Sequence, residues 1–335
     1  MKTVEYKLKI KEYIVPMKKV KLGGPLGMGR WGFMAPELAT FIYALVTILV
    51  ILFTWTSIDN PSELLWTRMQ FLSGTIALWV VFWLWPCKAV LLARIAYLLL
   101  MLGSWYPDTF SINRFFHSYD HVVAGWEQSL FGFQPALVFA EQFSNAVVSE
   151  LMYMGYFSYY LFFVGTVAVV FFKDFKQTER VTYMIFSAFY ICYVIFLVFH
   201  VAGPQYYYPA VGMENIAHGN FQDVELYFKE HSEAITSPGW TKGLFYNLVQ
   251  WAHRTGECPT AAFPSSHVAI AVLVMLMVGK MQMWRWLLIL AVPFIFLCLS
   301  TVYIYAHYAV DAIAGAVFAV LLFFLLGGMK LHKIQ

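Results

Sequence analysis

Residues 286–326 read WLLILAVPFIFLCLSTVYIYAHYAVDAIAGAVFAVLLFFLL. The stretch divides into two apolar runs, Trp286–Tyr305 and Tyr308–Leu326, and each is long enough to cross a bilayer core about 30 Å thick as a helix. A helix satisfies its own backbone hydrogen bonds, which lipid cannot do. The two runs therefore predict a helical hairpin in a membrane, with His307 and Asp311 at the turn.

Six further apolar runs precede this hairpin. They are Leu38–Ile58, Leu64–Trp85, Ala89–Trp105, Val147–Phe172, Val181–Ala202 and Pro264–Met281. Hydrophobic residues make up 61% of the chain and charged residues 12%, whereas soluble proteins carry about 25% charged residues. We therefore predict an all-α protein, a polytopic membrane helical bundle of about eight transmembrane helices. A net charge of +3 is too small for a nucleic-acid-binding surface, so we expect no nucleic-acid partner.

Lys and Arg are concentrated on one side of the predicted membrane. With eight spans both termini share a side, and that side carries most of the 22 Lys and Arg residues. The other side has only Arg68, Arg114, Lys229, Lys242 and Arg254. Because cytoplasmic segments are enriched in Lys and Arg, both termini are predicted to be cytoplasmic. Residues 1–35 form a basic tail that sets this orientation, and docking on anionic lipid is the alternative role.

Two outer loops, residues 106–146 and 203–263, are long enough to be functional. The second is followed by Pro264-Ser265-Ser266-His267, which opens the sixth apolar run. The first N–H groups of a helix lack partners and can bind an anion, although Pro and Ser are also ordinary residues for a helix start. His267 beside them is a titratable group suited to protonating a phosphate leaving group.

His307 and Asp311 are four residues apart and therefore lie on one helix face. A carboxylate so placed can accept the proton of one ring nitrogen and leave the other nucleophilic, and the alternative is an interfacial His with a neighbouring Asp. From His267 to His307 the chain has room for one helix across the membrane, a short turn and one helix back. Both histidines should therefore meet at the outer face.

These residues resemble the signatures of the type 2 phosphatidic acid phosphatases and their haloperoxidase relatives. The second family signature, P-S-G-H, reads Pro264-Ser265-Ser266-His267, and the third, S-R, five residues, H, three residues, D, reads Ser300-Thr301, His307 and Asp311. The resemblance implies a six-helix core, with His307 as a nucleophile that forms a phospho-histidine. It also implies Asp311 as the orienting partner of His307, His267 as the acid for the leaving group, and no metal or cofactor.

Two family cations are missing from this sequence. Thr301 stands where the third signature has Arg, and the first signature, K, six residues, R-P, is not found. A phosphate monoester carries close to two negative charges and a diester carries one, so a cation-poor site favours a diester. This pattern resembles the inositol phosphorylceramide synthase branch, as do Asp120 to Glu127 and the segment from Phe199 to Tyr206.

The resemblance divides the chain into a tail, residues 1–35, N-terminal transmembrane helices, residues 36–106, and a catalytic membrane domain, residues 107–330. Side chains of the outer loops could contact the phosphate or the headgroup. The candidates for substrate binding are Ser265, Ser266, Arg254, Gln205, Tyr206 and His200. A His that ends a span, such as His200, is also common as a plain interfacial residue.

Three functions remain to be compared. The first is a phosphotransferase that moves a phosphoryl headgroup, inositol phosphate by the resemblance, from a phospholipid donor to a lipid hydroxyl such as that of ceramide. The second is a lipid phosphate phosphatase that uses water and acts on phosphatidic acid or a polyprenyl (di)phosphate. A transporter is disfavoured because polar residues cluster at one face of the membrane. The site is predicted on the extracytoplasmic face, in a bacterial inner membrane or in the Golgi lumen of a eukaryote.

Overall fold

The computed structural model describes residues 32–254 and 256–328, and every regular element within these ranges is helical. This confirms the predicted all-α class. Most of the predicted basic tail, residues 1–35, lies outside the described residues. The first helices are α2 (Ala35–Phe53), α3 (Pro61–Leu84), α4 (Lys88–Asn113), α5 (Asp120–Phe131), α6 (Pro135–Gln142), α7 (Ala146–Phe157), α8 (Thr166–Lys173) and α9 (Thr178–Val198). The later helices are α10 (Pro204–Val211), α11 (Met213–Ala217), α12 (Leu244–Arg254), α13 (Ser266–Lys280), α14 (Trp284–Tyr303) and α15 (Ala309–Gly327).

All eight predicted apolar runs are helical, but they do not all span in the same way. Six helices of the described chain are long and apolar enough to cross a membrane: α2, α3, α4, α9 with the turn before it, α14 and α15. The run predicted at Val147–Phe172 is broken into α7 and Leu161–Lys173, which meet at 49°. A π-helical turn, Leu161–Gly165, lies just after this bend and accounts for it.

The sixth predicted run is shorter than expected. Helix α13 has 15 residues and is therefore about 22 Å long, less than the ~30 Å of a bilayer core. Its start is fixed against α15, because the Ser265 N–H donates to the Asp311 carbonyl oxygen at 3.0 Å. Gly315 allows this close approach, since a Cβ there would meet the Ser265 carbonyl oxygen at 2.5 Å.

Two arginines that were assigned to loops are buried inside the N-terminal helices. Arg94 of α4 donates from Nε to Glu37 of α2 at 2.7 Å, and Arg68 of α3 pairs with Asp108 of α4. Glu179 of α9 accepts the Ala35 N–H at 2.9 Å and links this group to the rest of the chain. Buried charges require such partners, so these two arginines do not count as loop charges in the orientation rule. One Arg is removed from the count on each side, and most of the remaining Lys and Arg still lie on the side predicted to be cytoplasmic.

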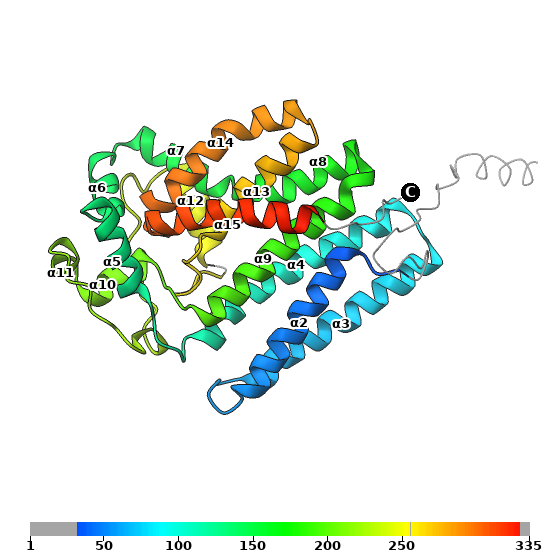
Figure 1. Cartoon of the computed structure of the whole chain (residues 1–335), viewed down its shortest axis with the longest axis horizontal. Coiled ribbons are helices and arrows are strands. Elements are labelled where there is room, and N and C mark those ends of the chain that lie inside the picture. Colours follow the sequence, from blue (N-terminus) through cyan, green and yellow to red (C-terminus); the bar gives the residue numbers. More distant parts are fainter. Residues whose placement is uncertain (1–31, 255, 329–335) are drawn as a thin grey trace, which may run out of the picture.

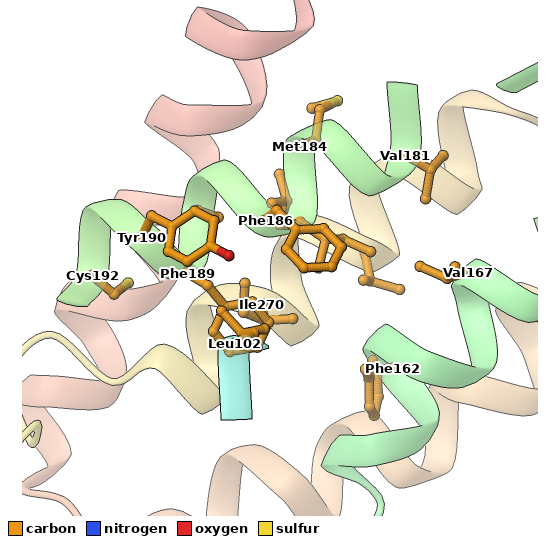
Figure 2. Packing of buried hydrophobic residues seen from close by; sticks show 14 of the residues in the cluster. Leu102, Phe162, Val167, Val181, Met184, Phe186, Phe189, Tyr190, Cys192 and Ile270 are labelled. Carbon is orange, nitrogen blue, oxygen red and sulfur yellow. The ribbon is translucent and has the colours of Figure 1, made fainter. Parts of the chain in front are cut away.

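The main apolar core forms where α4, the π-helical turn, α8, α9 and α13 meet (Figure 2). Leu102, Phe162, Phe186 and Ile270 in this core have no exposed surface or almost none. Figure 1 shows α2 and α3 beside α4 and α9, while α5, α6, α10 and α11 gather at one end of the molecule. The predicted boundary between residues 106 and 107 falls inside α4, which continues the third span to Asn113.

Large apolar side chains cover the outside of the bundle. Leu45 on α2 is 59% exposed, Leu288 on α14 73% and Phe324 on α15 70%. Surface of this kind on several long helices is stable in lipid and not in water. The chain is therefore an integral membrane protein.

Candidate active site

His307 lies in the short turn between α14 and α15 and is only 3% exposed. Its Nδ1–H donates to the Ala262 carbonyl oxygen at 2.8 Å, so Nε2 is the unprotonated ring nitrogen. Burial lowers the pKa of His307 to about 4, against the opposing effects of the Ala262 hydrogen bond and the Glu257 charge. The ring is therefore neutral at pH 7, as a nitrogen nucleophile must be.

His267 is the second residue of α13, and its ring faces His307. The His307 Nε2 and His267 Nδ1 atoms are 3.4 Å apart, although the residues are 40 positions apart in the chain. Tyr156 and Tyr159 flank the His267 ring, with centroids at 4.6 Å and 4.1 Å. The structure thus brings the two histidines of the sequence motifs into direct contact.

Asp311 is close to His307 but does not hold its ring in the predicted way. Its Oδ2 is 3.6 Å from the His307 Nδ1, beyond hydrogen-bond distance, and accepts the Tyr308 N–H at 2.8 Å. Asp311 is the third residue of α15, so its carboxylate caps the start of that helix. The Ala262 carbonyl, which the sequence did not reveal, holds the ring nitrogen instead.

We expect Asp311→Asn to lower the rate by roughly 10- to 100-fold, less than the ~10⁴-fold loss caused by a wrong tautomer in hydrolase triads. An amide oxygen can still accept the Tyr308 N–H, and Ala262 still selects the His307 tautomer. What is lost is the carboxyl group beside the phospho-histidine that we propose below. Steady-state turnover measures the effect, with Asp223→Asn, an exposed carboxylate, as control. A loss near 10⁴-fold would show that Asp311 takes the ring proton during turnover.

Helix α5 supports the turn that carries His307. Asp120 accepts the N–H groups of Ala202 and Gly203, both at 2.8 Å, and the Tyr308 hydroxyl at 3.1 Å. Glu127, two turns further along α5, accepts the Val310 N–H at 3.2 Å. Burial raises the pKa of Glu127 to about 8, with the Val310 hydrogen bond opposing. Glu127 can therefore be largely neutral at pH 7.

A cavity of about 910 Å³ leads to His267. Its apolar walls come from α4, α7, the π-helical turn and α9, and its polar end from α12 and α13. The lining within the described residues includes no Lys or Arg. His307 is not part of this lining, and it contacts the cavity wall through His267 at 3.4 Å.

The cavity contains two polar residues that the sequence analysis missed. The His253 Nε2 and Glu257 Oε2 atoms are 2.8 Å apart, and the Gln205 amide donates to Glu257 Oε1 at 2.6 Å. Burial alone would raise the pKa of Glu257, but its contacts with His253 and Gln205 outweigh burial and lower the pKa. The sequence did contain one signal for this pair. His253 and Glu257 are four residues apart shortly before the Pro264 motif, and this spacing is typical of interacting side chains.

The predicted binding residues divide into two groups. Ser266 lines the cavity, Gln205 reaches it through Glu257, and Ser265 caps α13 by accepting the Val268 N–H at 3.4 Å. Of the six candidates only Ser266 is itself part of the cavity lining, and the second group consists of Tyr206, His200 and Arg254.

Each of these three has another environment. Tyr206 is buried in a second apolar cluster. His200 is buried with its Nε2 at 2.8 Å from the Pro259 carbonyl oxygen, which indicates a structural role. Arg254 is exposed at the end of α12.

Thr301, at the position of the signature Arg, also faces away from the cavity. It is fully buried, its hydroxyl donates to the Cys298 carbonyl at 2.9 Å, and its own carbonyl accepts the His307 N–H at 2.9 Å. Thr301 therefore supports the His307 backbone. Within residues 32–254 and 256–328, no three His, Cys, Asp or Glu side chains are arranged to hold a metal ion.

One comparison with known proteins matches the part of the chain that contains this site. A family model described as the PAP2 superfamily matches residues 121–325, from α5 through α15. The comparisons with curated proteins and with solved structures find no match. The matched segment covers more than half of the chain and contains both histidine motifs, while α2 to α4 lie outside it. The chain therefore belongs to the PAP2 superfamily of membrane phosphatases and phosphotransferases.

Proposed function

We propose that the protein transfers a phosphoryl headgroup from a membrane phospholipid to the hydroxyl of a second lipid through a phospho-histidine on His307. The observation that carries this proposal is the pair of facing histidines at the end of a cavity with apolar walls and no Lys or Arg in its described lining. Such a cavity suits lipid chains and a singly charged phosphodiester better than a doubly charged monoester.

In the first step the His307 Nε2 lone pair attacks phosphorus, and the bond from phosphorus to the diacylglycerol oxygen breaks. His267 donates a proton to that oxygen, and the bound phosphodiester favours the protonated ring that this requires. In the second step the acceptor hydroxyl attacks phosphorus from the side that the diacylglycerol has left. His267 takes the hydroxyl proton, and the bond from phosphorus to His307 breaks.

The resemblance of the sequence to the inositol phosphorylceramide synthase branch indicates ceramide as the acceptor and inositol phosphate as the headgroup. The test is thin-layer analysis of the purified protein with labelled phospholipid, with and without ceramide. We expect a new labelled lipid only when ceramide is present. Release of water-soluble phosphate at the same rate without ceramide would identify a hydrolase, the alternative function.

We also propose that both termini are cytoplasmic and that the site faces the opposite side. In cells expressing a variant without Cys258 and Cys298, a cysteine at Asn220 or Lys242 should react with an impermeant maleimide from outside. A cysteine at Lys176 should not react until the cells are opened; all three positions are exposed. The reverse labelling pattern would invert this orientation.

A further inference from the structure

Glu257 is a carboxylate in a cavity that must also accept a phosphate. It lines the same cavity as His267, its side chain is 16% exposed, and the described lining supplies no Lys or Arg. His253 and Gln205 contact its two oxygens. The Glu257 carboxylate repels a phosphate bound in the same cavity. Its presence there calls for a function that outweighs this repulsion.

Three tyrosines line the same cavity as this carboxylate. They are Tyr106 of α4, Tyr156 of α7 and Tyr160 at the bend after α7. Tyr156 also packs edge-on against His253, with centroids 5.6 Å apart. A cavity lined by a carboxylate and aromatic rings is suited to an ammonium group, because the faces of aromatic rings attract a cation.

Charge balance separates the possible headgroups. A bound phosphodiester adds one negative charge near His307, and Glu257 contributes another. A neutral polyol headgroup leaves both charges in place, whereas an ammonium headgroup removes one of them. This difference holds whether His253 is neutral or protonated, because the state of His253 shifts both cases equally.

We propose that Glu257, with the rings of Tyr106, Tyr156 and Tyr160, forms a headgroup subsite for an ammonium group, so that the donor is a zwitterionic phospholipid. This inference rests on the proposed transfer function, and the inositol headgroup indicated by the resemblance is the alternative that the test below compares with it. Tyr106 lies outside the segment that matches the family, so the N-terminal helices contribute directly to the choice of substrate.

The test compares donors in detergent micelles with ceramide as acceptor: phosphatidylethanolamine, phosphatidylcholine, phosphatidylinositol and phosphatidylglycerol. We expect phosphatidylethanolamine or phosphatidylcholine to be used at least about tenfold faster than phosphatidylinositol and phosphatidylglycerol. The ethanolamine and choline arms distinguish a primary from a quaternary ammonium group. Equal or faster transfer from phosphatidylinositol or phosphatidylglycerol would overturn the headgroup inference and leave the transfer function standing.

Variants separate the charge from the rings. Glu257→Gln should raise KM for the ammonium lipid about tenfold or more and remove the preference over phosphatidylglycerol. Tyr160 is 46% exposed, so its replacement should not prevent folding. Tyr160→Leu should raise KM several-fold, and Tyr160→Phe, which keeps the ring face, should not. Glu230→Gln, at an exposed carboxylate, is the matched control. An unchanged donor preference in Glu257→Gln would contradict the subsite.

A binding measurement keeps the two proposals distinguishable. If no donor yields a ceramide-dependent product, the transfer function is wrong. The headgroup inference is then decided by titrating His307→Ala protein, which cannot react, with micelles of each lipid. Tighter binding of phosphatidylethanolamine or phosphatidylcholine supports the ammonium subsite, and equal binding of all four lipids overturns it.

Discussion

Replacing His307 with alanine should lower turnover by about 10⁴-fold or more, because the nucleophile and the groups around it act as a unit. The imidazole Nε2 is the atom that would bond to phosphorus, and alanine offers no substitute. The measurement is headgroup transfer by purified protein, together with trapping of an acid-labile labelled phospho-protein. Wild type should give the labelled intermediate, and His307→Ala should not.

Controls must show that the loss of activity in His307→Ala does not come from unfolding. His307→Ala leaves the buried Ala262 carbonyl without its hydrogen bond, which costs roughly 1–3 kcal/mol. His307→Gln keeps a side-chain donor and should unfold closer to the wild-type temperature while remaining inactive. His218→Ala changes an exposed histidine and should retain full activity. Substantial activity in His307→Ala would remove His307 from the proposed mechanism.

Replacing His267 with glutamine should have the second largest effect, and its size should depend on the leaving group. With a phospholipid donor the departing oxygen is a poor leaving group, so loss of the acid should slow the reaction by about 10²- to 10⁴-fold. With a p-nitrophenyl phosphodiester the departing phenolate needs no proton. The loss in the first step should then be less than about tenfold.

The comparison uses release of p-nitrophenol and of diacylglycerol by the same protein preparations. Ser129→Ala, an exposed hydroxyl on α5, is a control that should change neither rate. Equal losses with both donors would mean that His267 positions the substrate or the His307 ring rather than supplying the proton. Direct contact between the rings at 3.4 Å makes that the competing explanation to exclude.

Much of the architecture could be predicted because membrane insertion depends on local properties. The length of an apolar run and the need to satisfy backbone hydrogen bonds in lipid are readable from a single segment. The all-α class and the eight helical runs followed from this. The superfamily, which the family match confirms, followed from the two histidine motifs. The spacing between His267 and His307 also predicted their common face, because a helical hairpin has a known length per residue.

Other features depend on contacts between distant segments. The bend after α7 and the short α13 come from how these helices pack, and neither changes the hydropathy of the sequence. Arg68 and Arg94 looked like loop charges until Asp108 and Glu37 were placed beside them in space.

The candidate active site likewise combines features that the sequence predicts with features that depend on tertiary contacts. By itself, the sequence determined the membrane-embedded helical fold, its superfamily and the residue types able to form a phospho-histidine. Only the tertiary structure placed Ala262 against His307 and Tyr106 of α4 in the same cavity as Glu257. A backbone carbonyl carries no sequence signal, and a carboxylate in a loop does not reveal which cavity it lines. These arrangements arise from the packing of helices far apart in the chain, so the headgroup subsite could be proposed only from the folded protein.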